Sequence, residues 1–150
     1  MRQIIFIIMG AFLLSACGGT DKQKEAEELL KQAHSLFEQR QYDDALYCID
    51  SLRHIYPNAI DARKKALTLY QEIELKRTQD ELARTDSLLQ QVQHDYDRLQ
   101  SKVEKDKTEL RATPEELTLL TRTRMKRDSL RTQCEVLGAK IHYIHKKQKE

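Results

Sequence analysis

The chain has 150 residues, of which 33% are charged and 6% aromatic, with no Trp, two Pro and four Gly. This composition is typical of long helices and argues against one large core, because few aromatic side chains are available to fill it. Charge is uneven: residues 17–50 carry four basic and eight acidic residues (net −4), and residues 111–150 carry ten basic and five acidic (net +5). A solvated surface of mixed charge is the simplest interpretation, and steering toward a partner or a membrane surface is the alternative.

The amino terminus has the three zones of a secretory signal peptide. Arg2 and the free amine are positively charged, Ile4–Leu14 is an apolar run of eleven residues, and small residues follow at Ser15 and Ala16. The run is too short for a membrane-spanning helix, which needs about 20 residues. We therefore expect residues 1–16 to be a signal peptide that is removed on export.

The segment Leu14-Ser15-Ala16-Cys17 resembles the lipobox of bacterial lipoproteins, in which small residues precede an obligatory cysteine. The resemblance implies that Cys17 receives a diacylglyceryl thioether, that the chain is cut before it, and that the new amine is acylated. Fatty chains such as palmitate then hold the protein at a membrane, each buried CH₂ contributing about 0.8 kcal/mol. An ordinary signal peptide with an incidental cysteine is the alternative.

Two further features follow the lipobox. Gly18 stands where enterobacterial lipoproteins kept in the inner membrane carry Asp, so the resemblance implies sorting to the outer membrane, facing the periplasm. Residues 17–24 are small, polar and charged, and we expect them to form a flexible tether.

Apolar residues recur at helical spacing over residues 25–76, which predicts a module of packed helices. Its three stripes are Ala26, Leu29, Leu30, Ala33, Leu36 and Phe37; Ala45, Leu46, Ile49, Leu52, Ile55 and Tyr56; and Ile60, Ala62, Ala66, Leu69, Tyr70 and Ile73. The polar segment 40–44 separates the first two stripes and Pro57 closes the second, so we expect two antiparallel helices joined by a short turn.

The first two helices resemble a tetratricopeptide repeat that closes at Pro57. The small positions of that family fall on Ala33 and Ala45, its turn aromatic on Tyr42, and a bulky position on Ile49. One repeat of about 34 residues is covered. Because a single repeat cannot bury its own face, the third stripe is expected to cover it.

No Pro or Gly interrupts residues 58–113, so one helix is expected to run to about Arg111. Within it, Leu75, Leu82, Leu89, Tyr96, Val103 and Leu110 recur every seven residues, which is typical of a coiled coil. Thr113, Pro114 and Glu116 predict the start of a last helix, along which we place Leu117, Leu120, Leu130, Cys134, Leu137, Ile141 and Ile144. We expect residues 77–150 to form an antiparallel coiled-coil hairpin, and a parallel dimer through the 75–110 seam is the alternative.

The sequence carries no motif for a reaction. Cys48 and Cys134 lie in helical stripes where buried thiols are expected, and His142 and His145 lack the further ligands of a zinc site. Gly-rich phosphate loops and nucleophile motifs are absent. We predict a protein that is not an enzyme, with no metal, no small-molecule substrate, and no cofactor apart from the covalent lipid on Cys17.

The basic segment 122–131 is the strongest local concentration of charge. It lacks the interleaved aromatic residues of a nucleic-acid surface, so we expect no nucleic-acid partner. Anionic lipid headgroups are a better counter-charge for it in the envelope, and solubility is the simplest explanation.

These features predict an all-α, lipid-anchored adaptor in the cell envelope of a Gram-negative-type bacterium. Its partner is expected to be another envelope protein or a second copy of the chain. Repeat-bearing lipoproteins of the outer-membrane β-barrel assembly machinery are similar in parts, as are periplasmic coiled-coil proteins that coordinate envelope growth. A self-associating structural lipoprotein is the alternative function. The candidate contact residues are Gln32, Arg40, Tyr42, Tyr47, Arg122, Arg124, Arg127 and Arg131.

Overall fold

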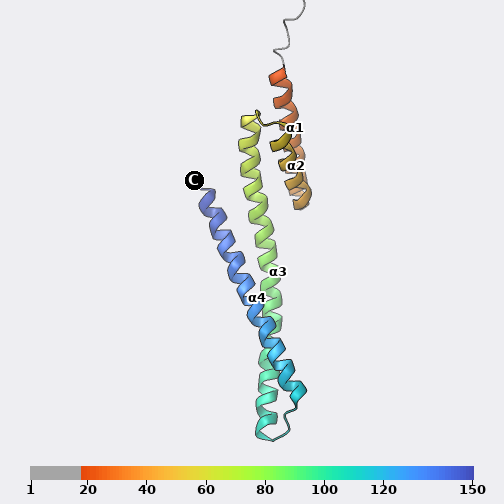
Figure 1. The fold of residues 1–150 in the computed structure, drawn as a ribbon, viewed down its shortest axis with the longest axis vertical. Helices are drawn as coiled ribbons and strands as arrows, with labels where there is room; N and C mark the ends of the chain where they lie inside the picture. The colour runs from red at the N-terminus through yellow and green to blue at the C-terminus, as the bar shows by residue number, and fades with distance from the viewer. Residues whose placement is uncertain (1–17) are drawn as a thin grey trace, which may run out of the picture. The chain divides into compact units, whose positions relative to one another are not determined.

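The computed structural model describes the backbone of residues 18–150 and the side chains from residue 21 onward, so the predicted signal peptide and Cys17 lie outside the described residues. Every regular element in residues 18–150 is a helix, which confirms the all-α prediction. The elements are α1 (Gly18–Glu38), α2 (Tyr42–Ile55), α3 (Ile60–Thr108) and α4 (Pro114–Lys147) (Figure 1). Residues 18–24, which the sequence suggested as a tether, are helical and belong to α1.

The chain divides into two compact units, of which the first ends at Ile73 and the second begins at Glu74. The boundary falls inside α3, which therefore contributes residues 60–73 to the first unit and residues 74–108 to the second. Each unit has its own buried residues, and we describe the two in turn.

The core of the first unit is built largely from alanine. Ala26, Ala33 and Ala45 are fully buried on α1 and α2, and their small side chains let the two helix backbones approach closely. Ala62 and Ala66 on α3 are also fully buried. Larger side chains close the remaining space in the same cluster, namely Ile49, Leu52, Leu69 and Ile73.

Two residues of the third predicted stripe lie outside this core. Ile60 is 62% exposed and Tyr70 is 36% exposed, whereas Ala62, Ala66 and Leu69 are buried as expected. Ile60 is the first residue of α3, and Tyr70 directly follows the buried Leu69, so both side chains are rotated away from the buried face. Arg53 of α2 lies over the Tyr70 ring, 4.9 Å from its centroid, and covers part of it.

The turn between α1 and α2 depends on Arg40, which has a φ of 61°. Its N–H donates to the Phe37 carbonyl and the Gln41 N–H donates to the Leu36 carbonyl, both at 2.9 Å. This pair of bonds is the Schellman ending of a helix, in which the left-handed residue is usually glycine. The bonds satisfy the last carbonyls of α1 and turn the chain directly into α2.

In the second unit, α4 runs antiparallel to residues 74–108 of α3. Lys140 Nζ lies 2.8 Å from Glu74 Oε2, the Arg127 guanidinium lies over Tyr96, and Lys102 contacts Glu116. The residue numbers of the partners on α4 therefore decrease as those on α3 increase, which is the pattern of antiparallel helices. In Figure 1 the chain accordingly runs along α3 in green and returns along α4 in blue.

The facing positions of the two helices form a seam in which steps of three and four residues alternate. On α3 these buried or half-buried positions are Leu75, Thr78, Leu82, Thr85, Leu89, Val92, Tyr96, Leu99, Val103 and Asp106. On α4 they are Glu116, Leu120, Thr123, Arg127, Leu130, Cys134, Leu137, Ile141 and Ile144. Six of these nineteen positions are Thr, Asp, Glu or Arg, so the seam is more polar than the predicted apolar stripes.

Two leucines of the predicted stripes are not in the seam. Leu117 is 37% exposed and neighbours the seam residue Glu116. Leu110 is 95% exposed and has a φ of 55°, because α3 ends at Thr108 rather than near Arg111.

The connection between α3 and α4 is fixed at both ends. On its first side, Leu110 N–H donates to the Lys107 carbonyl (3.1 Å) and Arg111 N–H donates to the Asp106 carbonyl (2.7 Å), which is a second Schellman ending. On its second side, the predicted capping box is confirmed. Glu116 N–H donates to Thr113 Oγ1 (3.2 Å), and Thr113 N–H donates to Glu116 Oε2 (3.1 Å).

Candidate protein-interaction surfaces

The first candidate surface is the part of the first unit around α2. Gln32, Arg40 and Tyr47 are exposed, and Tyr47 has 74% of its surface accessible. Tyr42 differs from them because its ring packs against the core and lies 6.2 Å, between centroids, from the Phe37 ring. Tyr47 is therefore the aromatic side chain of this group that a partner can reach most fully.

Sequence reasoning missed a second apolar residue on α2. Ile55 was expected to lie on the buried stripe, but it is 62% exposed at the last residue of the helix. Tyr56, the next residue and a member of the same predicted stripe, does pack against the core, and its hydroxyl donates to Glu25 Oε2 at 3.1 Å. Residues 47, 51 and 55 are spaced four apart, so Tyr47 and Ile55 lie toward one side of α2.

The second candidate surface is the basic segment of α4, and its arginines do not act alike. Arg122, Arg124 and Arg131 are exposed. Only 14% of the Arg127 side chain is exposed, because its guanidinium lies over the Tyr96 ring, 4.2 Å from the ring centroid. This contact joins α4 to α3 and combines electrostatic attraction with burial of the arginine stem.

Asp128 reduces the effective charge of this segment further. Arg127 donates to Asp128 Oδ1 from Nε at 2.9 Å and from Nη2 at 2.7 Å, and Arg124 Nε lies 3.7 Å from Oδ2. The hydrogen bonds from Arg127 lower the pKa of the Asp128 carboxyl, and the same contact raises the pKa of Arg127. The accessible positive charge of the segment therefore belongs mainly to Arg122, Arg124, Lys126 and Arg131.

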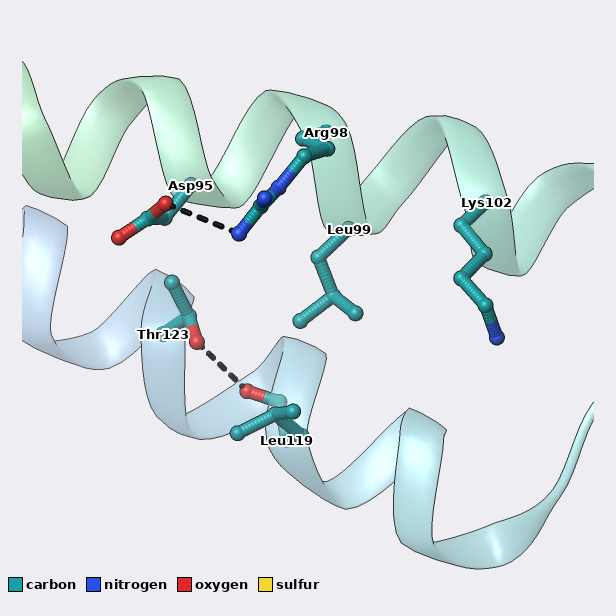
Figure 2. A pocket seen from close by; sticks show the side chains of 6 residues that line it. All are labelled: Asp95, Arg98, Leu99, Lys102, Leu119 and Thr123. Atoms are coloured by element: carbon teal, nitrogen blue, oxygen red, sulfur yellow. Dashed lines mark hydrogen bonds and ion pairs between the residues drawn. The ribbon is translucent and has the colours of Figure 1, made fainter.

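A shallow groove lies between α3 and α4 near their connection. It is lined by Asp95, Arg98, Leu99, Lys102, Leu119 and Thr123 (Figure 2). Arg98 Nη2 donates to Asp95 Oδ1 at 3.2 Å, and the Thr123 hydroxyl donates to the Leu119 carbonyl at 2.9 Å. The Leu119 side chain is 53% exposed in this groove, which gives it an apolar patch beside charged groups.

Lys102 links this groove to the end of the helix pair. Its ammonium donates to Asp106 Oδ2 at 3.0 Å and to the Glu116 carboxylate of α4. The hydrogen bond to Glu116, followed by the one to Asp106, raises the pKa of Lys102. The same ammonium, with the Thr113 N–H, lowers the pKa of Glu116. These charges hold the start of α4 against the end of α3.

The cysteine and histidine side chains considered for chemistry are divided between the two units and differ in burial. Cys48 is buried in the first unit, and desolvation, with a smaller effect of Asp44, raises the pKa of its thiol. Cys134 is half-buried in the second unit and is also a free thiol. His142 and His145 are exposed. Within residues 18–150, no three His, Cys, Asp or Glu side chains are grouped so that they could hold a metal ion.

Comparison with known proteins gives no assignment. The chain matches no family model, no curated protein and no solved structure. Among the described helices, none has the length and apolar character needed to cross a membrane. The lipid-carrying Cys17 stays a prediction from the sequence, because that residue lies outside the described part of the chain.

Proposed function

We propose that this protein is a lipid-anchored, non-enzymatic adaptor of the bacterial cell envelope. In this proposal Cys17 carries the lipid, the outer membrane holds the anchor, and the helices reach into the periplasm to bind another envelope protein. The observation that carries the anchor is the segment Leu14–Cys17, a lipobox-like sequence that directly follows an apolar run. No metal, cofactor, nucleic acid or small-molecule substrate forms part of the proposal.

The adaptor role is supported by the apolar surface that the first unit leaves open. Tyr47 is 74% exposed and Ile55 is 62% exposed on α2, although the alanine-rich core beneath them is filled. Exposed tyrosines are frequent anchors of protein interfaces, because the ring offers a large apolar area and the hydroxyl a hydrogen bond. We propose that Tyr47 and Ile55 contact the partner directly.

The finer architecture belongs to the same proposal. We propose that α1 and α2 form one tetratricopeptide-like repeat, and that residues 60–73 of α3 cover it as the first helix of a following repeat does. Support comes from the complete burial of Ala33 and Ala45 at the small positions of the repeat. We also propose that residues 74–147 form an antiparallel coiled coil, in line with the alternating steps of three and four along the seam.

The anchor is tested by labelling the full-length chain in a Gram-negative host with an alkyne-bearing fatty acid. We expect the wild-type chain to take up label and to fractionate with membranes. Cys17→Ser should lose the label and accumulate unprocessed, whereas the matched change Cys48→Ser should keep it. Gly18→Asp should keep the label and move the protein to the inner membrane. Equal labelling of wild type and Cys17→Ser would refute the anchor.

The adaptor surface is tested separately by photo-crosslinking in the same membranes. A benzophenone amino acid at Tyr47 is compared with the same amino acid at the exposed Lys65 of the first unit. We expect a covalent adduct to a different envelope protein from position 47 and none from position 65. If position 47 yields no adduct, or one only to another copy of the chain, the proposed contact surface is wrong.

A further inference from the structure

The side of α4 that is turned away from the seam carries an uncharged stripe. It consists of Met125, Ser129, Thr132, Val136, Ala139 and Tyr143, and we call it the outer stripe of α4. Successive members are four and three residues apart, which is the spacing that packs two helices side by side. All six are exposed, and the exposed fractions of Met125, Val136 and Tyr143 are 67%, 62% and 58%.

The outer stripe is more apolar than the solvent-exposed face of α3 in the same unit. Thr132 donates its hydroxyl to the Asp128 carbonyl at 3.1 Å, so its polar hydrogen is already used within the helix. The equivalent outward positions of α3 in this unit provide a comparison. They are Arg77, Asp80, Arg84, Ser87, Gln91, His94, Arg98, Ser101 and Lys105. Five of those nine are charged. On α4 the same spacing reaches the charged residues Arg122 and Lys146 only beyond the two ends of the outer stripe, so residues 125–143 form an uncharged stretch for which α3 has no equivalent of that length.

Charges flank the outer stripe with opposite signs on its two sides. Asp128 and Glu135 lie on one side, seven residues apart, and Lys126, Lys140 and Lys147 lie on the other at multiples of seven. When two copies of such a helix pack in parallel through the stripe, each acidic side faces the basic side of the other copy. Antiparallel packing would place like charges together, which is unfavourable.

We propose that the outer stripe of α4 is the contact surface of a parallel homodimer, in which α4 of a second copy packs against it in the same direction. Val136 of each copy then faces Val136 of the other at the centre of the contact. Glu135 of each copy lies beside Lys140 of the other, following the five-residue offset of flanking pairs in parallel coiled coils.

Lys140 can take part in this pair and keep its contact within the chain. Its ammonium donates to Glu74 Oε2 at 2.8 Å, and 46% of its side chain is exposed. An ammonium has three donors, so a second carboxylate can be accommodated. The dimer uses neither the seam nor the surface around Tyr47, and the charge argument does not depend on the lipid anchor.

Disulfide trapping in membranes expressing the full-length chain tests this dimer. The parent carries Cys48→Ala and Cys134→Ala and is measured alone, so that any bond formed by an unmodified Cys17 is recognised. Single cysteines are then added at Met125, at Val136, and at Arg84 on the outer face of α3 as the matched control. After mild oxidation, we expect Met125→Cys and Val136→Cys each to give a homodimer, and Arg84→Cys to remain at the parent level.

A charge change separates the parallel contact from chance collision. In the Val136→Cys chain, Glu135→Lys should lower the dimer fraction about five-fold, because two attractive contacts become repulsive. The same change at the exposed Glu104, which follows the seam residue Val103 on α3 as Glu135 follows Cys134 on α4, should leave that fraction unchanged. Circular dichroism of each purified variant verifies that the helices are intact.

Three results would overturn the proposal. The first is that neither Met125→Cys nor Val136→Cys dimerises above the parent. The second is that Met125→Cys reacts only when mixed with Tyr143→Cys, which indicates antiparallel packing. The third is that the cysteines form adducts only with a different protein.

Discussion

Replacing Leu110 by glycine should stabilise the second unit, although it removes an apolar side chain. Leu110 has a φ of 55° and is 95% exposed, so its side chain contributes almost no packing. The left-handed conformation costs a residue with a β-carbon about 1–2 kcal/mol, and glycine avoids this cost. Glycine also increases the entropy of the unfolded chain, which offsets roughly 0.5–1 kcal/mol of that gain. The expected net gain is about 0.5–1 kcal/mol in the free energy of unfolding.

Leu110→Ala is the matched control, because alanine removes most of the side chain but keeps the β-carbon that makes a positive φ unfavourable. The two Schellman bonds across the turn involve only backbone atoms, so both variants can retain them. Urea unfolding followed by circular dichroism should place the midpoint of the glycine variant above wild type and the alanine variant near it. A glycine variant that is no more stable than the alanine variant would refute the reasoning.

Three further predictions concern contacts of the second unit. Arg127→Ala should lower the free energy of unfolding, measured by urea titration, by about 1–2 kcal/mol, because it removes the cation–ring contact and the buried stem. The control Arg122→Ala, at an exposed position, should change it by less than about 0.5 kcal/mol. Thr113→Ala should lower it by about 1 kcal/mol in the same assay, through loss of the helix cap. Lys102 lowers the pKa of Glu116, so this contact stabilises the fold above the ordinary glutamate pKa and is lost as the pH falls through the lowered one. Glu116→Gln should therefore flatten the acid limb of a stability–pH curve, and an unchanged acid limb would contradict that assignment.

Helical content and the start of α4 were accessible from the sequence because they follow local rules, whereas α1 begins earlier than expected, at Gly18. The alanine-rich face of the first unit is set by periodicity, and the start of α4 is set by the capping residues Thr113 and Glu116. The end of α3 was misplaced because Leu110 adopts a left-handed conformation that its residue type does not favour. Nothing in its neighbouring sequence marks that departure.

The seam was only half visible in the sequence, because polar residues occupy part of it. Glu116, Thr123 and Arg127 continue the four-and-three spacing toward the start of α4, but a search for apolar residues selects Leu117 instead. The sequence also did not distinguish Arg127 from the other arginines of the basic segment, because residues close in sequence point in different directions around a helix. Counting back from Leu130 in steps of three and four would have separated Arg127 from the exposed arginines.

The polar seam residues also bear on which surface a second copy can use. Arg127 over Tyr96 marks one register of α4 on α3, because a shift of one heptad would set the guanidinium against Leu89 or Val103 with no aromatic ring to receive it. Such polar pairs are a known means of fixing helix register. They favour the pairing of α3 with α4 of the same chain over slipped alternatives.

Pairing two α3 helices in parallel through the same seam would be much less favourable. Asp106 would face Asp106 of the second copy, and Lys102, which within one chain donates to both Asp106 and the Glu116 carboxylate of α4, would lose Glu116. Tyr96 would also lose its cation. These costs disfavour self-association through the 75–110 seam. The outer stripe of α4 has none of them, since it is uncharged and flanked by charges of opposite sign, and a second copy can bind there while the seam stays closed.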